Sequence, residues 1–171
     1  GMIPTFGAEA QLGTNPIAIA VPTNRKYPFV FDAAMTAIAG NKIGLLERVG
    51  KPILPGWIAN SDGSPDMEGG SKAVIKKGTS RMQLPLGSTR ELGSHKGYGL
   101  GVAVDILCGI LSGASGFGRL TVDRRAHFVA AYKIDGFNSV SDFKSEMDEM
   151  LQGLMDTKTA PGHERVLSPG L

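Results

Sequence analysis

Residues 93–114, GSHKGYGLGVAVDILCGILSGA, join a Ser-His-Lys front to a long apolar run with one acid inside and glycines at regular spacing. Apolar residues at helical spacing on two faces predict a helix that is nearly surrounded by protein. The apolar part, residues 98–111, is shorter than the ~20 residues that cross a bilayer, and it contains Asp105. The stretch therefore predicts a core helix of a globular domain and not a membrane span.

One ridge of this helix has almost no bulk, because small residues recur every four positions. Its members are Gly97, Gly101, Asp105, Gly109 and Gly113. Each interior glycine costs a helix roughly 1 kcal/mol relative to alanine, so the ridge predicts that another backbone or a flat ligand approaches closely and offsets this cost. For Asp105 the sequence favours a structural carboxylate that caps backbone amides.

The front of the helix is a candidate anion site. With Ser94 as the N-cap, the amides of His95, Lys96 and Gly97 would point outward at the positive end of the helix dipole, beside the Lys96 ammonium. The plainer interpretation is a surface loop with a routine cap, a solvated lysine and a histidine without a special role, and spacing alone somewhat favours it. No GxGxxG follows a predicted strand, so a Rossmann cofactor site is not indicated.

The rest of the chain divides into short apolar runs between Gly- and Pro-rich turns. Strands are predicted for residues 15–22, 27–34 and 127–134, and the first two could pair as a hairpin. Helices are predicted for residues 35–49 and for the amphipathic stretch that follows an N-cap at Ser139. Residues 57–87 are predicted to form turns and loops. The pattern gives a mixed α/β (α+β) fold class.

Composition narrows the class of protein. The chain has 171 residues, 42% of them hydrophobic, and 18 basic against 16 acidic residues give a net charge of only +2. We therefore expect one globular domain or a piece of a larger one, with neither a nucleic-acid nor a membrane partner. The single cysteine, Cys108, favours a reducing, cytoplasmic setting. No histidine and carboxylate pair has metal-ligand spacing, so no metal site is predicted.

Five stretches in order resemble one family, the malate/L-lactate dehydrogenases of the non-Rossmann type, which includes ureidoglycolate, sulfolactate and 2,3-diketogulonate oxidoreductases. The stretches are LGTNPIAIAVP at residues 12–22, FDAAMTAIAGNKI at 31–43, LPLG at 84–87, GSHKGYGLGVAVDILCGILSGA at 93–114 and HFVAAYKI at 127–134. Two features depart from the family pattern: FDAAMT replaces the more usual FDMATS, and residues 88–92 resemble an insertion.

The resemblance implies an NAD(P)-dependent oxidoreductase that interconverts 2-hydroxy and 2-oxo acids. It implies a non-Rossmann fold with a mostly antiparallel mixed sheet and packed helices, assembled as a homodimer. The residues that match cofactor-binding positions are Gly13, Thr14, Asn15, Val30, Phe31, Asp32, Ala33, Ala34, His95, Lys96 and Gly97. It does not choose between NAD and NADP, and an arginine beside a ribose phosphate could be Arg90, Arg119 or neither.

The family's catalytic histidine and substrate-clamping arginine belong to a Ser-His-Gly…Arg motif on a segment that precedes the part matched here, so the catalytic residues are unknown. Residues 1–171 are accordingly expected to be a single domain that corresponds to the family's cofactor-binding part. The alternative is a non-catalytic binding or oligomerisation domain that keeps the fold. Ser94-His95-Lys96 is a different motif from the catalytic one.

Overall fold

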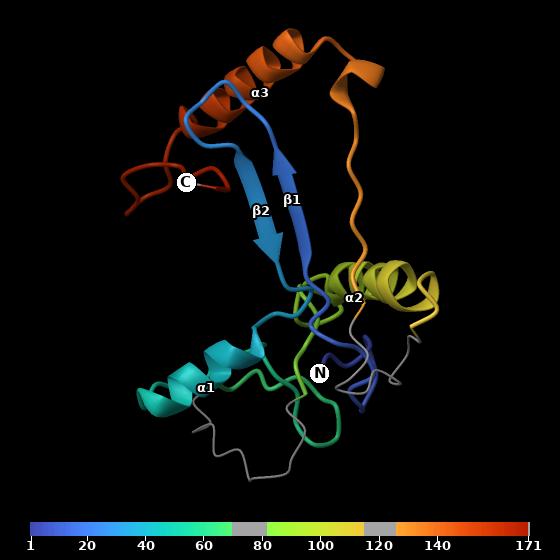
Figure 1. Cartoon of the computed structure of the whole chain (residues 1–171). Helices are drawn as coiled ribbons and strands as arrows, with labels where there is room; N and C mark the ends of the chain where they lie inside the picture. The colour runs from blue at the N-terminus through green and yellow to red at the C-terminus, as the bar shows by residue number, and fades with distance from the viewer. Residues whose placement is uncertain (70–81, 115–125, 171) are drawn as a thin grey trace. The chain divides into compact units, whose positions relative to one another are not determined.

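A computed structural model of the chain describes residues 1–69, 82–114 and 126–170 (Figure 1). These residues form two compact units. Unit 1 consists of Gly1–Ile17 and Ala34–Phe128, and unit 2 of Ala18–Ala33 and Val129–Leu171. Helices and a small sheet are both present, which confirms the mixed α/β class. The expected single domain stays a prediction.

A hairpin and a helix make up most of unit 2. Strands β1 (Ile17–Val21) and β2 (Phe29–Ala33) pair as a small antiparallel sheet, as the sequence predicts. Helix α3 (Val140–Met155) begins after Ser139, whose Oγ accepts a hydrogen bond from the Asp142 amide at 3.1 Å, so the predicted N-cap is confirmed.

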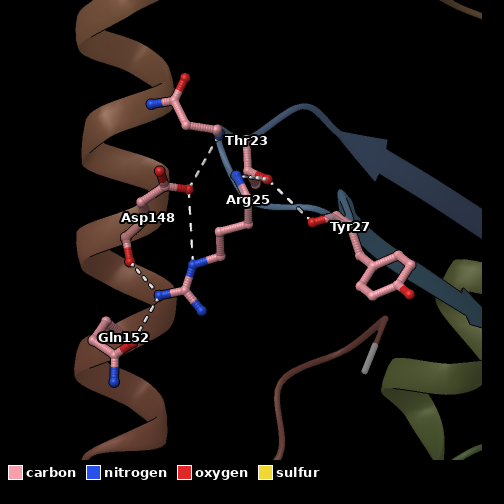
Figure 2. Close-up of polar contacts among 6 residues, drawn as sticks. Thr23, Arg25, Tyr27, Asp148 and Gln152 are labelled. Carbon is pink, nitrogen blue, oxygen red and sulfur yellow. Dashed lines mark hydrogen bonds and ion pairs between the residues drawn. The ribbon is translucent and has the colours of Figure 1, made fainter.

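The loop between the two strands is bound to α3 (Figure 2). The Arg25 Nη2 atom donates to the Asp148 carbonyl and to the Gln152 Oε1 atom, each at 3.0 Å, and Arg25 Nε lies 3.8 Å from Asp148 Oδ1. The Thr23 hydroxyl accepts from the Arg25 amide and donates to the Tyr27 carbonyl, both at 3.1 Å, which shapes the loop. These contacts fix the loop on the helix.

The predicted strand at residues 127–134 is wrong. The segment before Ile134 is extended but joins no sheet among the described residues, and Ile134 opens the short 3₁₀ helix η2 (Ile134–Gly136). Val129 is 89% exposed. A run of apolar residues that contains aromatic and β-branched side chains favours an extended backbone, but a strand also needs a hydrogen-bonded neighbour, which no local pattern can supply.

Unit 1 has its apolar cluster at helix α1 (Gly40–Arg48), where Ile38, Ile43 and Ile53 pack together. The helix begins five residues later than the predicted start at Met35. The Met35 amide instead donates to the Thr14 carbonyl and the Ala37 amide to the Leu84 carbonyl, both at 2.8 Å. Because these bonds join segments far apart in the sequence, helical spacing alone could not reveal them.

Helix α2 (Ser94–Val104) continues into the π-helical turn η1 (Asp105–Ile110). The prediction that protein nearly surrounds it is wrong for the described residues. Its apolar side chains form an exposed face, which consists of Leu100, Ile106, Leu107, Ile110 and Leu111. No helix within the described ranges is both long and apolar enough to cross a bilayer.

The glycine ridge, and not the apolar face, is the buried side of α2. A Cβ added at Gly97 would collide with the Leu86 backbone, and one added at Gly101 would collide with the fully buried Met2 side chain. The ridge is therefore approached by this chain's own atoms. Of the two predicted partners, another backbone or a flat ligand, the structure shows the first at Gly97.

Candidate functional site

The front of α2 begins at Gly93, not at the predicted N-cap Ser94. Gly93 adopts a left-handed backbone with φ of 102°, which glycine tolerates and serine disfavours. Ser94 is the first helical residue, is buried, and its hydroxyl lies 3.0 Å from that of Thr5. The side chain that was expected to cap the helix thus joins the N-terminal segment to it.

Of the three amides in the predicted cradle, that of Lys96 is not free. The Lys96 amide donates to the Gly93 carbonyl at 2.9 Å, and the preceding Ser94 amide donates to the Thr89 carbonyl at 2.8 Å. Gly97 is buried against the Leu86 backbone. The Gly93 carbonyl therefore accepts from one main-chain donor, the Lys96 amide, that sequence reasoning assigned to an anion.

Three side chains at this front are donors, and we call them the donor cluster: Arg90, His95 and Lys96. All three are exposed, and Arg90 Nη1 lies 2.9 Å from His95 Nδ1. A guanidinium can only donate, so His95 Nδ1 accepts and the hydrogen of the neutral ring is on Nε2. The end of the Lys96 side chain folds over Gly93, with Nζ 3.7 Å from the position of an added Cβ.

Two carboxylates, Glu91 and Asp62, lie near these donors. Glu91 follows Arg90 in the sequence, and both carboxylates line a cleft that is described below. The pKa of Glu91 is held below its usual value by its own backbone amide, by the Thr89 hydroxyl and by the Arg90 charge. The pKa of Asp62 is likewise lowered, chiefly by the Ser64 hydroxyl and the Ser64 amide. Both groups are therefore charged at neutral pH, and both already accept hydrogen bonds from their neighbours.

A cleft of about 390 Å³ in unit 1 adjoins the donor cluster. Its lining includes Thr5, Thr89, Arg90, Glu91 and Ser94. Sequence reasoning missed this cleft, because Thr5 and Ser94 are 89 positions apart. The available signal was Arg90, which lies in the segment that departs from the family pattern.

The Gly13-Thr14-Asn15 loop braces α2. Asn15 is buried with φ of 43°, and its Nδ2 atom donates to the Gly101 carbonyl and to Asp105 Oδ1, both at 2.7 Å. An added Cβ at Gly13 would come within 2.6 Å of Asn15 Oδ1. Asp105 therefore accepts from a side-chain amide, which corrects the prediction that it caps backbone amides.

The structure thus brings Asn15, which follows Gly13 and Thr14 in the chain, against the helix that carries His95, Lys96 and Gly97. The other predicted cofactor residues lie in or just after β2. Within unit 2, Val30, Phe31 and Asp32 are exposed and Ala33 is half-buried, while Ala34, also half-buried, begins the second segment of unit 1. No partner of the Asp32 carboxylate is present in the described part of the chain.

The described residues include no metal-binding cluster and one free cysteine. In the portions of the chain that the structure describes, no group of three or more histidine, cysteine or acidic side chains could hold a metal ion. Cys108 is a half-buried free thiol.

Comparison with known proteins gives the family. The model of the malate/L-lactate dehydrogenase family matches residues 1–171. The chain is 40% identical over 169 residues to a malate dehydrogenase of Pyrococcus abyssi, which covers 95% of this chain and 45% of that protein.

Solved structures agree with this match. Malate dehydrogenase from Entamoeba histolytica superposes with a TM-score of 0.81 at 26% identity, over 99% of this chain and 49% of that one. Sulfolactate dehydrogenase from Methanocaldococcus jannaschii gives 0.77 at 32% identity, over 99% and 47%. The chain spans about half the length of these relatives. It belongs to the malate/L-lactate dehydrogenase family.

Proposed function

We propose that the chain is the dinucleotide-binding part of an NAD(P)-dependent oxidoreductase that interconverts 2-hydroxy and 2-oxo acids. Family membership over residues 1–171 supports the reaction class, since the relatives are named malate, L-lactate and sulfolactate dehydrogenases. The observation that carries the proposal is the donor cluster on the α2 front, where Arg90 contacts His95 and Lys96 folds over the N-cap.

The residues present fit a dinucleotide in their chemistry. Its phosphates are anions with many acceptor oxygens, and the side chains of His95 and Lys96 can donate to them. In unit 2, the exposed Val30, Phe31 and Asp32 match cofactor-binding positions of the family pattern, and their role in binding stays a prediction. When bound, the nicotinamide supplies hydride transfer. In this proposal Gly13 and Thr14 border the nicotinamide, while the Asn15 side chain positions α2.

The other half of the reaction belongs to the full-length enzyme. A hydroxy acid needs a base for its hydroxyl and a cation for its carboxylate. We assign both to a Ser-His-Gly…Arg segment that the family pattern places before the matched part. The same proposal includes a non-Rossmann, mostly antiparallel sheet and a cytoplasmic location.

A homodimer is the assembly we propose. The exposed apolar face of α2 and η1, where Leu111 is 67% exposed, supports an interface. The same face favours the second candidate function, a non-catalytic oligomerisation domain. Sedimentation should show a dimer in both cases, so dinucleotide binding is the measurement that separates them.

In the test, NADH and NADPH are titrated into the purified protein and binding is measured by nicotinamide fluorescence. Turnover is then measured with a panel of 2-oxo acids. Lys96→Ala should weaken binding by roughly tenfold, because an ammonium contact with an anion contributes about 1.5–3 kcal/mol. Its melting temperature should change little, since the Lys96 side chain is exposed. Lys51→Ala, an exposed lysine after α1, is the matched control. Absence of dinucleotide binding by the unmodified protein would contradict the proposal and favour the oligomerisation domain.

A further inference from the structure

We infer that Arg90 makes this enzyme prefer NADP(H) to NAD(H), because the donor cluster receives the 2′-phosphate of the adenosine ribose. The inference rests on the proposed function and goes beyond it, since neither the family match nor the names of the relatives choose between the two dinucleotides. It assigns a specificity role to a residue outside the family's motifs.

The donor cluster is built from side chains and not from the helix N-terminus. The Ser94 and Lys96 amides are bound within the chain, so the main chain offers little to a ligand at this turn. Arg90 instead presents a planar guanidinium that contacts His95 through Nη1 at 2.9 Å. Because this contact fixes the hydrogen of neutral His95 on Nε2, the exposed ring also offers a donor.

Among the residues that the structure describes, no ion pair within 4 Å includes Arg90 or Lys96, although the Arg90 charge acts on the neighbouring Glu91 carboxylate. Within residues 1–69, 82–114 and 126–170, the ion pairs join Arg25 to Asp148 and Lys133 to Asp135. Arg90 and Lys96 take part in neither pair. The positive charges of Arg90 and Lys96 and the ring donor of His95 therefore lie close in sequence on one exposed turn. Arg90 also lines the neighbouring cleft, together with the carboxylates Asp62 and Glu91.

A phosphate monoester matches this set better than a hydroxyl does. It carries about −1.5 to −2 charges at neutral pH and three acceptor oxygens. The planar fork of arginine donates two parallel hydrogen bonds to such a group. The free 2′-hydroxyl of NAD has no charge and would be recognised by a carboxylate acceptor.

Glu91 is the carboxylate that could favour NAD instead. Its lowered pKa reflects hydrogen bonds from its own backbone amide and from the Thr89 hydroxyl, and then the Arg90 charge. Those two donors occupy part of the Glu91 carboxylate, whereas the Arg90 guanidinium, engaged through Nη1 by His95, keeps further N–H donors for a phosphate. The charges and hydrogen-bond donors of this turn therefore favour NADP(H) over NAD(H).

Arg90 lies in residues 88–92, which depart from the family pattern. Gly93 and Gly87 fix this segment against the helix, because an added Cβ at Gly87 would collide with the Gly93 carbonyl group. The guanidinium is thus held on a short loop anchored at the helix front, and the predicted preference is a property of this chain.

The experiment measures dissociation constants of NADPH and NADH by fluorescence titration of the purified protein and of three variants. The unmodified protein should bind NADPH at least about tenfold more tightly than NADH. Arg90→Ala should weaken NADPH binding roughly 10- to 100-fold, since a hydrogen bond to a charged group contributes in this range, and should weaken NADH binding by a clearly smaller factor. Arg90→Lys should fall between, because it keeps the charge and loses the fork.

Arg48→Ala removes an exposed arginine from the last turn of α1 and is the matched control, with both constants unchanged. Equal constants for the two dinucleotides, or a parallel loss of both in Arg90→Ala, would overturn the inference while the proposed function stands. Failure of the unmodified protein to bind either dinucleotide would overturn both. A melting temperature for each variant separates loss of the phosphate contact from loss of structure.

Discussion

Replacing Asn15 by alanine should destabilise unit 1 by about 2.5–4 kcal/mol. The Asn15 side-chain amide donates at 2.7 Å to Asp105 Oδ1, and Asp105 is only 9% exposed. Loss of a hydrogen bond to a buried charged group costs about 1.5–3 kcal/mol. A further ~1 kcal/mol follows because Asn15 has φ of 43°, where alanine is less tolerated than asparagine.

The assay is urea unfolding followed by the fluorescence of Trp57. It is the single tryptophan of the chain and packs against the cluster of Ile38, Ile43 and Ile53, so it reports on unit 1. Asn15→Gly is the matched control, because glycine accepts the backbone and still lacks the amide. It should recover about 1 kcal/mol relative to alanine.

A double-mutant cycle with Asp105→Ala isolates the contact itself. In the Asn15→Ala background the second substitution should cost at least about 1 kcal/mol less than it does alone, since residues in direct contact are not additive. A free energy of unfolding within about 0.5 kcal/mol of the unmodified value for Asn15→Ala, or additive costs in the cycle, would refute the reasoning.

Two further predictions concern packing and pH. Gly97→Ala should destabilise unit 1 by about 3 kcal/mol, because its Cβ meets backbone atoms, whereas Gly99→Ala, with open space around it, should stabilise α2 by about 0.5–1 kcal/mol. Urea unfolding followed by Trp57 fluorescence measures both changes. Equal effects of the two substitutions would contradict the close approach at Gly97. The Asp62 carboxylate has a folded-state pKa below its unfolded value, so its stabilising contribution is present at neutral pH and is lost as the pH falls through the folded pKa. Ser64→Ala should move that pKa back toward its usual value in an NMR titration; an unchanged titration would show that the hydroxyl is not the main cause.

Local sequence predicted the elements that depend on local causes. The hairpin of β1 and β2 follows from two apolar runs around a polar turn, and the start of α3 follows from the Ser139 cap. The start of α1 and the strand at residues 127–134 were wrong for a common reason. In both segments the backbone depends on whether a distant segment offers a hydrogen-bonding partner.

In the candidate site, too, the sequence predicted local features and missed contacts that depend on the folded backbone. Sequence singled out His95 and Lys96, and the structure places both at an exposed helix front beside Arg90. It could not predict that the amides there are bound by the preceding loop, since that depends on the left-handed Gly93. Cofactor binding by these residues stays a prediction.

The glycines of α2 connect the packing of the helix to its proposed role. A stripe of small residues predicts that another group approaches the helix closely, but it does not identify that group. In this structure Leu86 approaches Gly97 and Met2 approaches Gly101. Asn15 adds a hydrogen bond on the same ridge. Leu86, Met2 and Asn15 come from separate segments and hold one side of α2. The helix is therefore held in place by the chain itself, without any ligand. The helix cost of the glycines is therefore offset by tertiary packing, and in the proposed function this packing would fix the backbone that carries Lys96 before any anion binds.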